Sequence, residues 1–276
     1  MGDEDTAGHV TRAAERSIRA LRAELEGGSP WGELRVVREL PGGNRRTVLL
    51  VERRGERFVA KQPSRSPEAL AWLVAVQQRA RQTGLVVPEL VRSDRGALVE
   101  DGVTLERWIE GRPPDARSLA RLHSLLRDFH EATRDVPQRP GFASSIALVE
   151  RPNGGDIDLE AMPDDLVRTC RAAWKRLADA PRSAVHGDPN RDNILETADG
   201  QVALVDWDEA RVDASILDEV ALSLALGGRP RPGWEAAEAA LEAWEVAACW
   251  QHEPAHARRL AARMRRNVNT GRRRTP

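Results

Sequence analysis

Hydrophobic residues alternate with polar ones between residues 34 and 61, which is the spacing typical of half-buried strands. The turn residues PGGN at 41–44 and Gly55 divide this stretch into three runs. The pattern therefore predicts three consecutive antiparallel strands, and Lys61 ends the third.

A helix and two shorter strands are expected to follow. The helix begins at Ser66-Pro67, a capping residue followed by a proline suited to the first helical position, and it stops at Gly84. Short apolar runs at 84–93 and 96–102 predict the two strands. Together these elements form a five-stranded antiparallel sheet with one helix.

The hydrophobic period changes beyond residue 102. A stripe at helical spacing from Leu119 to Phe129 predicts a core helix, and later segments rich in alanine, leucine and tryptophan predict further helices. Residues 135–165 carry proline, glycine and acids without a period, so we expect an irregular insertion there.

The prediction is an α+β protein of two lobes. Apolar residues at helical spacing between Val10 and Leu25 give an N-terminal helical extension over 1–28. The sheet forms an N-terminal lobe over 29–102, and a larger, mostly helical C-terminal lobe occupies 103–276.

Composition excludes several classes of protein. The 276 residues carry 42 Lys+Arg against 43 Asp+Glu, a net charge of −1, which gives no field to recruit nucleic acid. The longest apolar run, Ala69 to Val76, is too short to cross a membrane, and no apolar leader opens the chain, so we expect a cytoplasmic protein. Cys170 and Cys249 show no CxxC and no Cys/His metal-binding spacing and are interpreted as ordinary buried thiols, without structural zinc.

The stretch HGDPNRDN at 186–193 carries the most chemistry. Asp188 lies five residues before Asn193, and Asp206 follows at the end of the apolar run VALV. Phosphoryl transfer needs a carboxylate to accept the proton of an attacking hydroxyl, and oxygen ligands to hold magnesium on the phosphates. It also needs a cation on the phosphates, for which Lys61 is the candidate, with Glu68 on the next helix to orient it.

These residues resemble the kinase-like small-molecule phosphotransferases, which include aminoglycoside phosphotransferases, choline kinases and homoserine kinases. The resemblance rests on VAK at 59–61, HGDPNRDN at 186–193 and VDWDEA at 205–210. It implies a protein-kinase-like fold, with ATP (GTP left open) and Mg²⁺ as cofactors.

The resemblance also assigns roles to residues. Asp188 would be the catalytic base, Asn193 and Asp206 the metal ligands, Lys61 the phosphate anchor and Glu68 its partner. Gly42 and Gly43 would form a hairpin over the phosphates. Glu100, in LVEDG, would belong to a hinge between the two lobes whose backbone contacts the nucleotide. His186 and Asp218 would support the catalytic loop.

The acceptor is expected to be a small hydroxylated molecule. Only twelve residues separate Asp206 from Asp218, which leaves no room for the activation loop of a protein kinase. Acidic residues of the same region favour a cationic acceptor such as an aminoglycoside, aminosugar or amino alcohol. A solvated charged face is an equal interpretation of these acids. The candidates for binding the acceptor are Asp208, Glu209 and Asp213.

Two other functions compete with this one. A pseudokinase scaffold would bind nucleotide without turnover, and its mark would be a lost catalytic residue, which this chain does not show. Nucleic-acid binding would rest on GRRR near the C-terminus, where solvated charge is the default. The sequence leaves the oligomeric state open.

Overall fold

The computed structural model describes residues 21, 22, 25, 27–40, 48–62, 65–228 and 231–270, of which 267–270 are described by their backbone alone. Gly42, Gly43 and most of the predicted leading helix lie outside these residues. The chain forms two compact units, Met1–Ala71 with Pro88–Trp108, and Trp72–Val87 with Ile109–Pro276.

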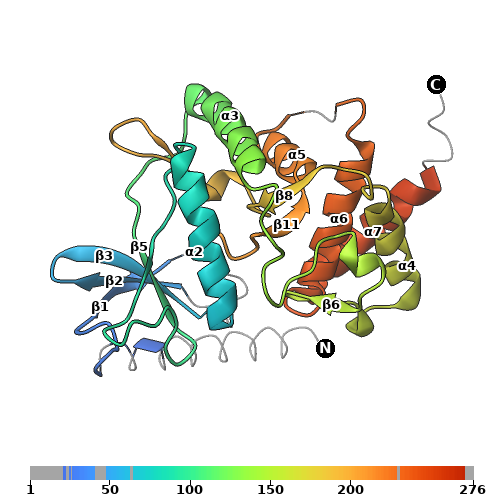
Figure 1. Cartoon of the computed structure of the whole chain (residues 1–276). Helices are drawn as coiled ribbons and strands as arrows, with labels where there is room; N and C mark the ends of the chain where they lie inside the picture. Colours follow the sequence, from blue (N-terminus) through green and yellow to red (C-terminus); the bar gives the residue numbers. More distant parts are fainter. Residues whose placement is uncertain are drawn as a thin grey trace, which may run out of the picture. The chain divides into compact units, whose positions relative to one another are not determined.

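The first unit contains the predicted sheet, which is confirmed (Figure 1). Its strands are β1 (Arg35–Glu39), β2 (Val48–Arg53), β3 (Glu56–Lys61), β4 (Leu90–Val91) and β5 (Thr104–Arg107). They pair antiparallel in the order β1-β2-β3-β5-β4. Trp31 and Phe58 are fully buried beneath the sheet together with Leu21 and Leu25.

The boundary between the units differs from the one near residue 102 that the sequence predicts. The first unit runs on to Trp108, because β5 belongs to its sheet. Helix α2 (Pro67–Gln82) begins in the first unit, while its residues from Trp72 onward make their contacts with the second. The alternation of residue types marks where elements lie but not where a helix makes its contacts.

The second unit is mainly helical, with short two-stranded sheets. Its helices are α3 (Ala116–Ala132), α4 (Asp164–Lys175), α5 (Ile216–Ala225), α6 (Glu235–Cys249) and α7 (Pro254–Thr270). The predicted irregular region holds η1 (Ala147–Val149), η2 (Leu159–Ala161), β6 (Asn153–Gly154) and β7 (Ile157–Asp158). Helices α4, α6 and α7 pack together (Figure 1), and Trp174 and Trp244 lie in the core that they share.

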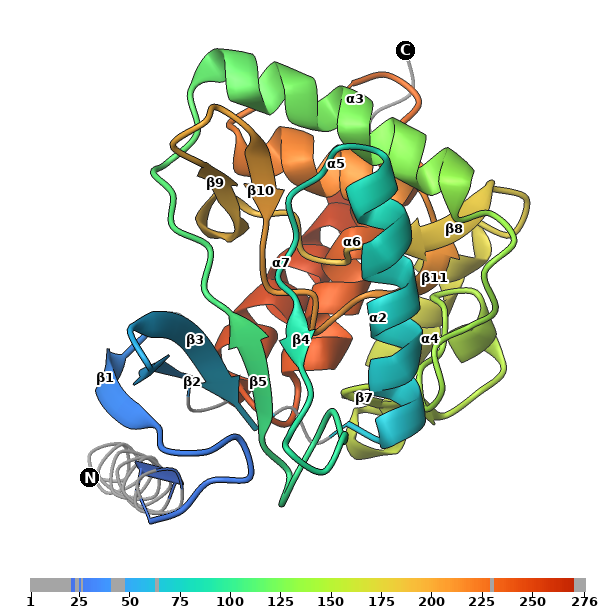
Figure 2. The same cartoon turned by 60° about the vertical axis from the view of Figure 1, so that its left-hand side comes forward.

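Two antiparallel strand pairs carry the loops that hold most of the predicted site residues. Strand β8 (Arg182–Val185) pairs with β11 (Arg211–Ala214), and β9 (Ile194–Glu196) pairs with β10 (Val202–Leu204). The loop after β8 includes η3 (Arg191–Asn193), and the loop after β10 leads into β11. Helix α3 packs against β8 and β10 (Figure 2). In the part of the chain that is described, no helix combines the length and the apolar character that a membrane span requires.

Candidate active site

Residues 186–188 form a sharp turn as the chain leaves β8. Gly187 has a φ of +92°, a conformation that side chains rarely adopt. A Cβ at this position would lie 2.7 Å from Glu209 O and 2.8 Å from the guanidinium of Arg211. Glycine is therefore required twice, for its backbone conformation and for the close approach of the neighbouring loop.

Asp218 holds this turn from the first turn of α5. Its carboxylate is fully buried and accepts hydrogen bonds from the backbone amides of His186 (2.7 Å) and Gly187 (3.0 Å). His130 Nε2 on α3 lies 3.0 Å from the same carboxylate. Burial would raise the pKa of Asp218, but the His130 hydrogen bond and the other contacts outweigh it and lower the pKa, so the group is a carboxylate.

The His186 ring joins the two loops. Its Nε2 donates to Val205 O at 2.9 Å, and its Nδ1 accepts from the Asp188 amide at 3.3 Å. Burial lowers the pKa of this histidine, so the ring is neutral, with the proton that these bonds place on Nε2. The ring packs edge-on against buried Trp207, with centroids 4.8 Å apart.

Asp188 and Asn193 form a hydrogen-bonded pair. Asp188 Oδ2 accepts from the side-chain amides of Asn190 (2.9 Å) and Asn193 (3.2 Å). Asp188 Oδ1 and Asn193 Oδ1 make no hydrogen bond within the described parts of the chain. Each residue thus presents one oxygen for another ligand.

The environment of Asp188 favours its protonated form. Asp188 is exposed at the surface, although its carboxylate is partly desolvated by the surrounding protein. This desolvation, followed by the negative charge of Glu209 and weaker contributions from Glu245 and Asp206, raises the Asp188 pKa to about 7. Such a carboxyl can take up a proton near neutral pH.

Asp206 is exposed at the end of β10 and has a φ of +62°. This left-handed conformation is uncommon outside glycine, and it often occurs at functional sites. Asn193 directly precedes β9 and Asp206 follows its antiparallel partner β10, so both lie at the same end of this strand pair. They supply an amide oxygen and a carboxylate, the donor types that Mg²⁺ prefers. The donor set therefore fits the magnesium that the sequence predicts.

Two buried arginines fix the loop after Asp206, and neither is among the residues predicted for the site. Arg139 donates to Asp208 O and Ala210 O, both at 3.0 Å, and stacks on Phe142. Arg211 donates to Glu209 O and lies 3.3 Å above the Trp244 ring. Arg139 lies in the aperiodic region 135–165, where no pattern distinguishes it from other loop arginines.

Lys61 has a different neighbour from the one predicted. Its Nζ lies 3.4 Å from a carboxylate oxygen of Glu106, and both side chains are buried. Glu68 is exposed. Hydrogen bonds from its own backbone amide and, to a smaller extent, from the Ser66 side chain lower the pKa of its carboxyl group. The described contacts assign Lys61 to Glu106 on β5, not to Glu68 on α2.

Glu100 lies in a tight turn before β5 and not in the connection between the units. Its backbone amide donates to Val103 O, and its carbonyl accepts from the Val103 amide. Its side chain accepts from Ser93 at 2.7 Å. The chain changes units at Ala71–Trp72, Val87–Pro88 and Trp108–Ile109, and Glu100 lies at none of these connections.

The three acidic candidates for acceptor binding differ in exposure. Asp208 and Glu209 are partly exposed, and Glu209 accepts from Trp244 Nε1 at 3.1 Å. Asp213 is 1% exposed and accepts hydrogen bonds from Ser145 and Arg211. Asp213 therefore braces β11, and the prediction that it contacts an acceptor is corrected.

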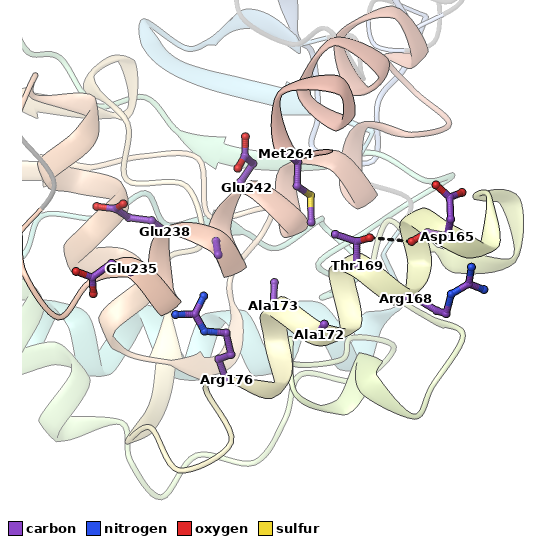
Figure 3. A pocket seen from close by; sticks show the side chains of 11 residues that line it. Asp165, Arg168, Thr169, Ala172, Ala173, Arg176, Glu235, Glu238, Glu242 and Met264 are labelled. Atoms are coloured by element: carbon purple, nitrogen blue, oxygen red, sulfur yellow. Dashed lines mark hydrogen bonds between the residues drawn. The ribbon is translucent and has the colours of Figure 1, made fainter. Parts of the chain in front are cut away.

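A cavity of about 740 Å³ in the second unit lies elsewhere (Figure 3). Helices α4 and α6 line it with arginines and glutamates, and Met264 of α7 contributes to its wall. None of the residues predicted for the site lines this cavity, so it has no part in the chemistry considered above.

Comparison with known proteins gives a consistent picture. The model of a family described as "Phosphotransferase enzyme family" matches residues 36–256. No curated protein sequence matches the chain.

Solved structures of small-molecule kinases share the fold. An amicoumacin kinase has a TM-score of 0.59 at 14% identity, with 97% of this chain and 96% of that chain covered. Choline kinase LicA from Streptococcus pneumoniae has a TM-score of 0.57 at 16% identity, covering 83% and 94%. A thermostable mutant of aminoglycoside phosphotransferase APH(4)-Ia has a TM-score of 0.56 at 15% identity, covering 87% and 96%. At such identities the likeness establishes the fold, and it confirms the predicted kinase-like class.

The geometry of Gly187 predicts a large effect of one added methyl group. Gly187→Ala should lower the free energy of unfolding by about 2–4 kcal/mol, because it combines backbone strain with a clash against backbone. Gly200→Ala is the matched control, since Gly200 has a φ of +74° but open space around its Cβ position, and it should cost about 1 kcal/mol. Equal losses in urea unfolding would contradict the close approach.

The raised Asp188 pKa predicts a pH-dependent stability difference. The pKa of about 7 exceeds the unfolded value of about 3.9, so wild type loses stability as pH rises between these values, while Asp188→Asn does not. Without nucleotide or divalent metal, the variant should be more stable at pH 8 by about 1 kcal/mol, a discounted value because water screens the group. Its advantage should shrink toward pH 4. A stability difference independent of pH in urea unfolding would rule out the raised pKa.

Proposed function

Since this chain belongs to the phosphotransferase enzyme family, we propose that it transfers the terminal phosphoryl group of ATP to a hydroxyl group of a small molecule. The observation that supports this most is the braced loop 186–193. It presents Asp188 Oδ1 at the protein surface, and Asn193 lies against the same side chain. Acceptor and metal chemistry would thereby meet on one loop.

Asp188 is proposed as the base. Its Oδ1 would accept the hydroxyl proton while the acceptor oxygen forms a bond to the terminal phosphorus and the bond from that phosphorus to the bridging oxygen breaks, releasing ADP. The amides of Asn190 and Asn193 hold Oδ2, so rotation of the carboxylate is restricted. A pKa of about 7 suits a group that must bind and release a proton near neutral pH.

Asn193 and Asp206 are proposed to hold Mg²⁺. When bound, the ion would neutralise phosphate charge that the acidic surroundings of Asp188 would otherwise repel. Lys61 is proposed as the phosphate anchor. Its buried contact with Glu106 limits the directions in which the ammonium can point.

ATP is the proposed donor, with GTP left open. The structure of the amicoumacin kinase contains AMP-PNP and Ca²⁺, and that of the aminoglycoside phosphotransferase contains ADP. These are properties of those proteins, and they support an adenine nucleotide here because the fold is shared.

The proposed acceptor carries an amine as well as a hydroxyl group. Asp208, Glu209 and Glu245 are partly or fully exposed, and two of them, Glu209 and Glu245, act electrostatically on Asp188. Negative charge around the base favours a cationic substrate. The aminoglycoside phosphotransferase with hygromycin B bound and the choline kinase, both similar in fold, also support a cationic acceptor.

Nucleoside diphosphate release against a panel of acceptors tests this proposal. The panel pairs hydroxylated amines, aminoglycosides and amino alcohols with their N-acetylated forms, and we expect turnover with cationic members and a higher KM for acetylated partners. Turnover of neutral sugars alone would overturn the cationic acceptor. Nucleotide binding without turnover of any member would favour the pseudokinase.

Two variants separate the proposed roles. Asp188→Asn should lower the transfer rate by about 10²–10⁴-fold and leave nucleotide affinity nearly unchanged, since the base acts on the acceptor. Lys61→Ala should weaken both nucleotide affinity and rate, because the cation acts on the phosphates. Lys175→Ala, which removes the chain's other, exposed lysine, is the control.

Calorimetric nucleotide titration beside single-turnover kinetics would measure both effects. Wild-type turnover by Asp188→Asn would remove the proposed base. Unchanged nucleotide affinity in Lys61→Ala would remove the proposed anchor.

A further inference from the structure

A second cluster of metal-ligating groups lies where α6 ends and α7 begins. Glu245 and Cys249 are four residues apart on α6 and therefore share one helix face. Four residues follow before Pro254 opens α7, and this short turn brings His256, in the first turn of α7, back to that face. The ligand atoms of Glu245, Cys249 and His256 all lie within 4.8 Å of one another.

Two of the three separations match the edges of a coordination tetrahedron. Cys249 Sγ lies 3.4 Å from Glu245 Oε1, and His256 Nε2 lies 3.5 Å from the same oxygen. Bonds of about 2.3 Å to sulfur and about 2.0 Å to nitrogen and oxygen, at tetrahedral angles, imply edges of about 3.3–3.5 Å. Glu253 Oε1 lies farther away, 4.0 Å from the sulfur and outside this group of three, so it would have to move to become a fourth ligand.

The exposures suit an ion that enters from solvent. The Cys249 residue is 1% exposed, while the His256 and Glu245 side chains are 39% and 51% exposed. The sulfur is thus anchored in the protein, and the other two ligands are open to water.

We propose that Glu245, Cys249 and His256 form a binding site for Zn²⁺ or a similar divalent transition metal, with Glu253 or water completing the shell. Thiolate and imidazole select such metals over Mg²⁺, which prefers oxygen ligands. On binding, the Cys249 thiol gives its proton to solvent and a metal–sulfur bond forms. The site links α6 to α7. The proposed phosphoryl transfer uses neither Cys249 nor His256, while Glu245 also belongs to the acidic residues near Asp188.

The other cysteine shows the contrast. Cys170 lies inside the helical core, where its Sγ contacts only a backbone oxygen, that of Ala243 at 3.8 Å, among the described hydrogen bonds. Burial raises the pKa of this thiol to about 12, which disfavours the thiolate that a metal requires. Both cysteines are free and buried, as the sequence predicts, and the turn between two helices additionally gives Cys249 the neighbours Glu245 and His256, which no sequence spacing reveals.

Titration of the full-length, metal-free protein with Co²⁺ and then Zn²⁺, in excess Mg²⁺ to saturate oxygen-only sites, tests the proposal. Wild type and Cys170→Ala should each bind one equivalent of Co²⁺ with a thiolate-to-metal charge-transfer band that Zn²⁺ removes. Cys249→Ala should lack the band. His256→Gln should weaken Zn²⁺ affinity at least about tenfold.

His252→Gln is the matched control, because His252 is exposed, four residues before His256 and outside the cluster, so it should bind like wild type. If Cys249→Ala fails to fold, the comparison of His256→Gln with His252→Gln decides, since His256 is partly exposed. Absence of the band in wild type, its persistence in folded Cys249→Ala, or equal affinities of the two histidine variants would each overturn the site.

Discussion

The buried carboxylate of Asp218 is the interaction on which the site depends. A carboxylate removed from water without partners is costly, and here two consecutive backbone amides and an imidazole satisfy it. Because those amides belong to His186 and Gly187, the same bonds that stabilise Asp218 fix the direction in which the chain reaches Asp188. One side chain of α5 thereby converts a surface loop into a defined arrangement of oxygen atoms.

The second loop is fixed by different means. Asp206 adopts a left-handed conformation, and the following carbonyls are held by Arg139 and Arg211, whose charges are buried against aromatic rings. His186 then joins the two loops through Val205. Strain at Asp206 and the raised pKa of Asp188 both reduce stability locally, which is the usual consequence of pre-organising a functional site.

The sequence revealed features that are local in the chain. Alternation and turn residues located four of the five strands, while the strand expected within 96–102 lies at Thr104–Arg107. The motif HGDPNRDN contains both Asp188 and the two asparagines that hold its side chain. Contacts between segments distant in the chain could not be predicted from the sequence. The choice of Glu106 over Glu68 beside Lys61 depends on the pairing of β3 with β5, Arg139 lies in an aperiodic stretch, and a run of acids does not show that Asp213 is buried.

Amide hydrogen exchange at His186 and Gly187 tests most directly whether Asp218 organises the loop 186–193, which carries the proposed base. Both amides should exchange as slowly as the neighbouring amides of β8, far more slowly than Gly200, whose amide lies in an exposed turn. Asp218→Asn should accelerate exchange at both sites while β8 keeps its protection. Exchange at His186 and Gly187 as fast as at Gly200 in wild type, or unchanged in the variant, would contradict the role assigned to Asp218.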